Sequence, residues 1–247
     1  MIGLDKILTL CEILALRLAD LTITEIPHAN LEDKTKLRYS RKLLPYAARF
    51  IDLDEFKIII PFNNRKNVIG FVGRLERDKG IIELIQAIEI IRHGYPKLFR
   101  ELIFYFIGDG SLRKYILKKV RGLDNVKVLG YVPHNELPRY LNELKLLLLP
   151  SKKEGIPTAL VEAMACGVIV LATPVGGIPS IIKHGENGFL LNNLAPKTIA
   201  QLIVGVTSLD ESKLIEISRR AFETVNKTFS LSSAIARYSL IVKQCLK

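Results

Sequence analysis

Short runs of consecutive apolar residues recur along the chain from about residue 67 onward. They cover residues 68–72, 102–107, 126–129, 146–149 and 168–171. Continuously apolar runs are typical of parallel strands that helices cover on both faces, whereas half-exposed strands alternate. Segments with helical periodicity lie between them, at 81–92, 112–121, 135–143 and 158–165. This alternation predicts an α/β fold with a doubly wound, parallel, Rossmann-like sheet.

The two ends of the chain have a different pattern. After residue 191 the periodicity predicts C-terminal helices over 196–209, 212–227 and 230–246. A first helix is predicted over 4–19, and it contains the charged residues Asp5, Lys6, Glu12 and Arg17. These charges exclude a membrane span, and we expect no signal peptide before them.

Composition and charge narrow the choice of partners. The 247 residues are 49% hydrophobic and 25% charged, which is typical of a globular protein, and the net charge is +11. A basic chain suits nucleotide diphosphates, anionic membrane surfaces or nucleic acid. Nucleic acid is the least favoured of these, because aromatic residues make up only 7% and no nucleic-acid module is recognisable. The basic clusters are either solvated helix faces or a peripheral membrane contact: Lys34, Lys36, Arg38, Arg41 and Lys42, and Arg113, Lys114, Lys118, Lys119 and Arg121.

The three cysteines and four histidines show no metal-ligand spacing, so no metal site is predicted. His134 and His184 lie beside predicted loops, where surface or capping roles are expected rather than catalysis. Scattered cysteines also point to a reducing compartment, and we expect a cytoplasmic protein that is at most peripheral at the membrane.

Two carboxylates flank the turn that begins the helix predicted at 158–165. Glu154 lies in the turn, after a strand that ends near Pro150, and Glu162 lies about one turn into the helix. A helix N-terminus after a strand presents unpaired N–H groups that suit a phosphate, and carboxylates accept hydrogen bonds from sugar hydroxyls. Together they predict a nucleotide-sugar site. The alternatives are charge complementarity with the helix N-terminus for Glu162 and plain solvent exposure for Glu154.

Further motifs fall in a fixed order around this pair. They are Gly73-Arg74-Leu75 with Lys79-Gly80, Gly108-Asp109-Gly110, Gly130-Tyr131-Val132-Pro133, Pro150-Ser151, Gly176-Gly177-Ile178-Pro179 and Asn187-Gly188-Phe189-Leu190. With the two glutamates, this series resembles family-4 retaining glycosyltransferases of the GT-B fold (glycosyl transferases group 1), in their C-terminal, donor-binding half. The resemblance runs from about residue 67 to 191. Two departures stand out: Ser180 where the family has Glu, and Leu144-Lys145 where it has a small residue and Asp.

The resemblance implies transfer of a hexose-type sugar from a nucleotide diphosphate to an acceptor hydroxyl, with retention. Arg74 and Lys79 would stabilise the diphosphate leaving group, so no metal ion and no cofactor is required. Gly73 would let the backbone approach the phosphates, Glu162 would hold the ribose, and Glu154 would orient the sugar. The family also implies backbone contacts to the base from Tyr131 and Val132, and backbone N–H groups from Gly155, Ile156, Pro157, Thr158 and Ala159. Ion pairs with Glu76 or Asp78 are the alternative role for Arg74 and Lys79.

The same resemblance divides the chain into three parts. Residues 1–62 match a remnant of the N-terminal domain with the interdomain linker, 63–228 the nucleotide-sugar-binding domain, and 229–247 the helix that crosses back. Most of the N-terminal half of a typical member is absent. The alternative function is therefore a non-catalytic nucleotide-sugar-binding or regulatory subunit, whose partner chain carries the domain for a glycan or lipid acceptor. An epimerase or phosphorylase of the same fold is a third candidate.

Overall fold

The computed structural model describes residue 18, residues 22–24 and 43–45, and residues 49–245. The chain divides into two compact units, Ile51–Ser230 and Met1–Phe50 with Leu231–Lys247. In the second of these, β1 (Thr22–Thr24) pairs in parallel with β2 (Leu43–Pro45), and α10 spans Leu231–Cys245. The helix predicted over 4–19 lies outside the described residues except for Leu18. No helix among the described residues is long and apolar enough to cross a membrane.

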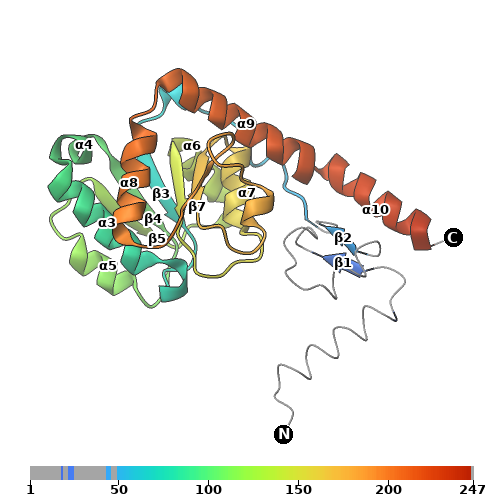
Figure 1. Cartoon of the computed structure of the whole chain (residues 1–247), viewed down its shortest axis with the longest axis horizontal. Helices are drawn as coiled ribbons and strands as arrows, with labels where there is room; N and C mark the ends of the chain where they lie inside the picture. The colour runs from blue at the N-terminus through green and yellow to red at the C-terminus, as the bar shows by residue number, and fades with distance from the viewer. Residues whose placement is uncertain (1–17, 19–21, 25–42, 46–48, 246–247) are drawn as a thin grey trace, which may run out of the picture. The chain divides into compact units, whose positions relative to one another are not determined.

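The unit Ile51–Ser230 is built on a parallel sheet whose strands follow the order β5-β4-β3-β6-β7-β8 (Figure 1). The strands are β3 (Val68–Val72), β4 (Ile103–Ile107), β5 (Val126–Gly130), β6 (Leu146–Leu149), β7 (Ile169–Ala172) and β8 (Phe189–Leu190). Within this sheet the first strand is β3, in the centre. The next two strands, β4 and β5, lie to one side of β3, and β6 then lies on the other side of β3. This is the doubly wound order, and the prediction of fold class is confirmed. The strand β8 was not predicted, because two residues carry no periodicity.

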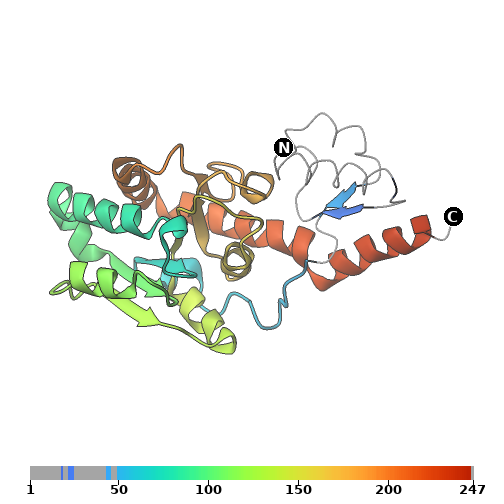
Figure 2. The same ribbon diagram turned by 90° about the horizontal axis from the view of Figure 1, so that it is seen from below.

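Helices cover both faces of this sheet, as Figure 2 shows from below. They are α3 (Ile81–Gly94), α4 (Pro96–Glu101), α5 (Arg113–Lys119), α6 (Leu137–Glu143), α7 (Thr158–Ala165), α8 (Pro196–Thr207) and α9 (Glu211–Phe229). The helix α8 packs on α3, and α9 packs on α7. The buried residues of α3 recur at helical spacing: Ile81, Leu84, Ile85, Ile88 and Ile91. The short α4, which begins with a proline, was not predicted, and α6 starts two residues late because a 3-10 turn, His134–Glu136, precedes it.

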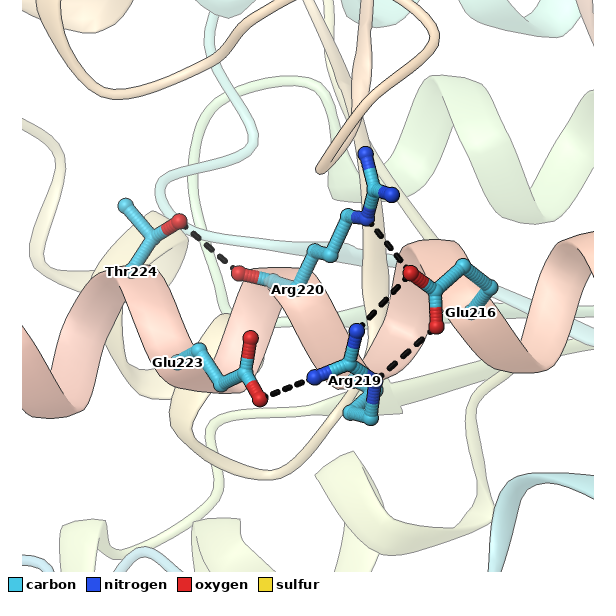
Figure 3. A network of polar contacts seen from close by, with 5 residues as sticks. All are labelled: Glu216, Arg219, Arg220, Glu223 and Thr224. Carbon is cyan, nitrogen blue, oxygen red and sulfur yellow. Dashed lines mark hydrogen bonds and ion pairs between the residues drawn. The ribbon is translucent and has the colours of Figure 1, made fainter.

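The long helix α9 has one buried and one charged face. Leu214, Ile217 and Ala221 are buried. The solvent face carries a network of ion pairs and hydrogen bonds, drawn in Figure 3. Glu216 accepts from Arg219 and from Arg220, which lowers the pKa of Glu216 to about 2. Exposed pairs of this kind add little stability, so burial and not the network keeps α9 in place.

Two buried polar side chains hold the segment that leads into the sheet. Arg65 is 5% exposed, and its guanidinium donates to three backbone carbonyls, those of Ile60 (2.9 Å), Leu144 (2.8 Å) and Cys166 (2.7 Å). Burial lowers the pKa of Arg65 to about 10, so it remains charged at neutral pH. The Asn142 amide oxygen accepts from the N–H groups of Ile59 (2.7 Å) and Ile60 (3.1 Å). Residues 57–66 are therefore part of the sheet unit.

The loops after neighbouring strands pack against one another without room for a side chain. Gly108, after β4, has φ +129° and donates its N–H to the carbonyl of Gly130, the last residue of β5, at 2.7 Å. A Cβ at Gly108 would lie 2.0 Å from the carbonyl oxygen of Gly73, after β3. The motif glycines thus set the spacing of the carboxyl ends of three strands.

We expect Gly108→Ala to lower the free energy of unfolding by roughly 1–3 kcal/mol, because alanine is strained at this φ and overlaps a backbone oxygen. Guanidinium unfolding of the full chain measures it. The matched control is Gly205→Ala in α8, where nothing lies within 4 Å of the new Cβ. A helical site should gain about 0.5–1 kcal/mol from the same change. Equal unfolding midpoints for Gly108→Ala and the wild type would contradict the close-packing argument.

Candidate functional site

A cavity of about 220 Å³ opens at the carboxyl ends of β3 and β6. These two strands are neighbours at which the strand order reverses, the place where doubly wound sheets bind their ligands. The cavity is lined by Phe71, Val72, Gly73, Arg74, Lys79, Leu149, Ser151, Glu154, Pro157, Thr158 and Ala159. Many predicted site residues are among them, brought together from the loop after β3 and from the start of α7.

The shortest ion pair in the cavity joins Lys79 and Glu154. The Lys79 Nζ lies 2.6 Å from Glu154 Oε1, and the two side chains are only 17% and 12% exposed. A partly buried pair is less screened than a surface pair, so it ties the loop after β3 to the turn before α7. Lys79 therefore does not form the alternative ion pair with Glu76 or Asp78.

Arg74 lines the same cavity from a more exposed position. Its Nη2 lies 3.4 Å from Asp78 Oδ2, with the side chains 70% and 48% exposed. The alternative considered for Arg74, a surface ion pair, is thus present in this structure. Such a long and solvated pair holds the guanidinium weakly, and Arg74 can re-orient toward an anion in the cavity at little cost.

The loop that carries Arg74 and Lys79 is fixed to the loop after β4 through Glu76. The Ser111 N–H donates to Glu76 Oε1 at 2.8 Å, and the Ser111 hydroxyl donates to Oε2 at 2.5 Å. The hydrogen bonds from Ser111 lower the pKa of Glu76. The sequence indicates Glu76 only as an ion-pair partner, since nothing in the chain's pattern pairs residues 35 apart.

Ser151 adds an unsatisfied group to the wall of the cavity. It is fully buried, and its hydroxyl oxygen has no hydrogen-bond partner among the described residues. A buried polar group without a partner costs roughly 1–3 kcal/mol, and a polar ligand in the cavity would remove that cost. In the sequence Ser151 stands out only as part of a motif, and it was not predicted as a site residue.

A double glycine shapes the turn that presents Glu154. A Cβ at Gly176, where φ is +58°, would lie 1.9 Å from the Glu154 carbonyl oxygen. The Gly177 N–H donates to the Gly155 carbonyl at 2.7 Å. In the turn itself Glu154, Pro157, Thr158 and Ala159 line the cavity. Gly155 and Ile156 are not among the residues that line it, and Pro157 has no backbone N–H to donate.

Glu162 lies outside this cavity, on α7, and it meets a histidine. Its side chain is 4% exposed, and Oε1 lies 2.8 Å from Nε2 of His134, whose side chain is 63% exposed. This hydrogen bond raises the pKa of His134. Tyr131 and Val132, the predicted base contacts, lie between β5 and His134. Tyr131 is exposed, Val132 is half-buried, and neither residue lines the cavity. The contact of His134 with Glu162 was not predicted, because a lone histidine has no ligand spacing.

The part of the chain that the structure describes holds no group of three or more His, Cys, Asp or Glu side chains arranged to bind a metal ion. The charges that face the cavity from the described residues come from Arg74, Lys79 and Glu154. The arrangement therefore offers two cations, one carboxylate and a buried hydroxyl to a polar, anionic ligand.

Comparison with known proteins identifies relatives along most of the chain. The family model for glycosyl transferases group 1 matches residues 52–221. A putative teichuronic acid biosynthesis glycosyltransferase (TuaC) of Bacillus subtilis (strain 168) is 32% identical over 219 residues, covering 84% of this chain and 52% of the relative. The N-acetyl-alpha-D-glucosaminyl L-malate synthase of Bacillus anthracis is 26% identical over 237 residues, covering 91% and 60%. The chain thus spans about half the length of the curated relatives it matches.

Solved structures agree on the fold. Anabaena HepE, crystallised in complex with UDP and glucose, superimposes with a TM-score of 0.74 at 20% identity, covering 99% of this chain and 68% of that one. The C-terminal domain of a group 1 glycosyl transferase family protein (LpcC) of Francisella tularensis gives a TM-score of 0.62 at 25% identity, covering 73% and 99%. The six-stranded parallel sheet and its helices therefore have the Rossmann-like α/β fold of these solved structures. With the family match over 52–221, the chain belongs to the glycosyl transferases group 1 family.

Proposed function

We propose that this chain supplies the donor-binding half of an enzyme that transfers a sugar from a nucleoside-diphosphate sugar to an acceptor hydroxyl, with retention of configuration. One observation carries the proposal: the Lys79 ammonium and the Glu154 carboxylate meet at 2.6 Å in the cavity where β3 and β6 end. A cation and a carboxylate side by side suit a ligand that has an anionic diphosphate next to a neutral, hydroxyl-rich sugar.

In the bound state the ion pair exchanges partners. Lys79 moves to the diphosphate together with Arg74, and Glu154 then accepts hydrogen bonds from the sugar hydroxyls. The two cations stabilise the negative charge that develops on the leaving diphosphate, which is the role a metal ion has in other transferases. Gly73 keeps the backbone beside the phosphates clear of a side chain, and the buried Ser151 hydroxyl gains a partner.

The nucleoside lies beyond the diphosphate, toward the loop after β5. Glu162, buried at 4% exposure, accepts hydrogen bonds from the ribose hydroxyls, and the backbone of Tyr131 and Val132 lies next to the base. The HepE structures contain UDP, so uridine is the base to test first.

Titration calorimetry with UDP, GDP and ADP, with and without magnesium, tests the donor site. We expect one nucleotide to bind without magnesium. Lys79→Met and Arg74→Ala should weaken that binding about tenfold or more, because each removes a charge-assisted hydrogen bond. Arg77→Ala is the matched control, since Arg77 is exposed in the same loop and does not line the cavity. An equal loss of affinity in Arg77→Ala would mean that net charge, and not this cavity, governs binding.

A second candidate is a non-catalytic nucleotide-sugar-binding or regulatory subunit that depends on a partner chain with the acceptor domain. The chain spans about half the length of the relatives it matches, so transfer by the chain alone has to be measured. In this arrangement the donor cavity is kept, and the acceptor is bound by another polypeptide.

Release of nucleoside diphosphate from the bound sugar donor, measured with pooled lipid and glycan acceptors, separates binding from transfer. We expect the chain alone to bind the donor and to transfer little or no sugar, because the charged groups that line the cavity are all assigned to the donor. Product formation by the chain alone at ordinary enzymatic rates, of about 1 per second or more, would contradict this expectation.

A further inference from the structure

A buried carboxylate at the nucleoside end of the site is contacted from outside by a histidine. Glu162 is 4% exposed, whereas His134, 2.8 Å away, is 63% exposed. A carboxylate offers about four acceptor positions on its two oxygens, and His134 Nε2 uses one of them. A hydrogen bond from a restrained donor favours one orientation of the carboxylate, as the outer hydrogen bonds around a metal site orient its ligands.

The His134 ring is itself restrained. It belongs to the 3-10 turn His134–Glu136, and Pro133, at φ −55°, fixes the entry to this turn. The ring also packs against Phe56, with centroids 5.1 Å apart and planes inclined at 50°. Phe56 is 1% exposed, and its N–H donates to the Asp52 carbonyl at 2.9 Å. The imidazole therefore contacts both a buried aromatic ring and a buried carboxylate.

The charges around His134 favour the protonated imidazole. The hydrogen bond to Glu162 is the main cause of the raised pKa, partial burial opposes it, and the charges of Glu162 and Glu55 add to it. A protonated ring donates a charge-assisted hydrogen bond, which is shorter and stronger than a neutral one.

We propose that His134 is a positioning residue: its hydrogen bond and its contact with Phe56 hold the Glu162 carboxylate in the orientation that accepts the ribose hydroxyls of a bound nucleotide. The inference rests on the proposed function, in which Glu162 binds the ribose, and it adds the residues that make this recognition selective. The consequence is that His134 affects binding only through the ribose hydroxyls and leaves the diphosphate contacts of Lys79 and Arg74 unchanged.

The first test is whether the bond exists in solution. An NMR titration of the His134 ring in the full chain should give a lower pKa in Glu162→Gln than in the wild type, because the carboxylate that stabilises the imidazolium is gone. His93 provides an internal reference, since its partner is Glu89 on α3 and not Glu162. An unchanged pKa of His134 would overturn the proposal.

The decisive experiment compares the dissociation constants of the nucleoside diphosphate that binds and of its 2′,3′-dideoxy analogue. We expect the wild type to prefer the ribose form by about tenfold or more, and Glu162→Gln to lose most of this preference. In His134→Ala the preference should fall toward that of Glu162→Gln, while the affinity for the dideoxy analogue stays at the wild-type level. His134→Gln, which can still donate a hydrogen bond, should restore part of the preference. The matched control His93→Ala should change neither constant.

The outcomes separate this inference from the proposed function. If Glu162→Gln loses the preference and His134→Ala keeps it, the positioning role is wrong and the donor site stands. If His134→Ala weakens the binding of both ligands by the same factor, His134 has a general structural role, and the inference is also overturned. If the wild type binds both ligands equally and Glu162→Gln changes nothing, the ribose role of Glu162 in the proposed function fails as well.

Discussion

The reversal of strand order between β3 and β6 is the constraint on which the site depends. Because both strands are parallel neighbours, their carboxyl ends meet, and the loops that follow them must share one space. Lys79 comes from one loop and Glu154 from the other, and they meet in this space at 2.6 Å. Glycines allow the loops to approach, since a Cβ at Gly108 or Gly176 would lie within 2.0 Å of a backbone oxygen of a neighbouring loop.

The electrostatics of the cavity follow from that convergence. Two largely buried charges of opposite sign stabilise one another only while they are paired, because each alone would carry a desolvation cost. A ligand that offers an anion to Lys79 and hydroxyl donors to Glu154 replaces the pair without leaving either charge alone. The buried Ser151 hydroxyl, which has no partner among the described residues, gains from the same exchange. In the proposed function, selectivity would therefore come from the need to satisfy both partners of the ion pair at once.

The sequence predicted the parts of the fold that have strong local signals. Continuous apolar runs located β3 and β6 to the residue, and helical spacing located α7, because burial on both sides leaves a clear pattern. The two residues of β8 and the six of α4 carry too little periodicity to be recognised. The motifs also placed Lys79 and Glu154 in one site. Their direct contact, 75 positions apart in the chain, depends on strand order and could not be inferred from spacing.

Two of the residues that the sequence did not reveal share a physical feature: each contacts a neighbour that is distant in the chain. Glu76 orders the cationic loop through Ser111, and His134 contacts a carboxylate 28 positions away. Neither has a spacing that distinguishes it from a solvated side chain.

The same holds for Phe56, which directly precedes the segment that Arg65 and Asn142 hold on the sheet unit. Phe56 is buried and packs on the His134 ring, and it is continuous in the chain with this anchored segment. In the proposed function, the anchoring of residues 57–66 therefore supports nucleotide recognition as well as the fold.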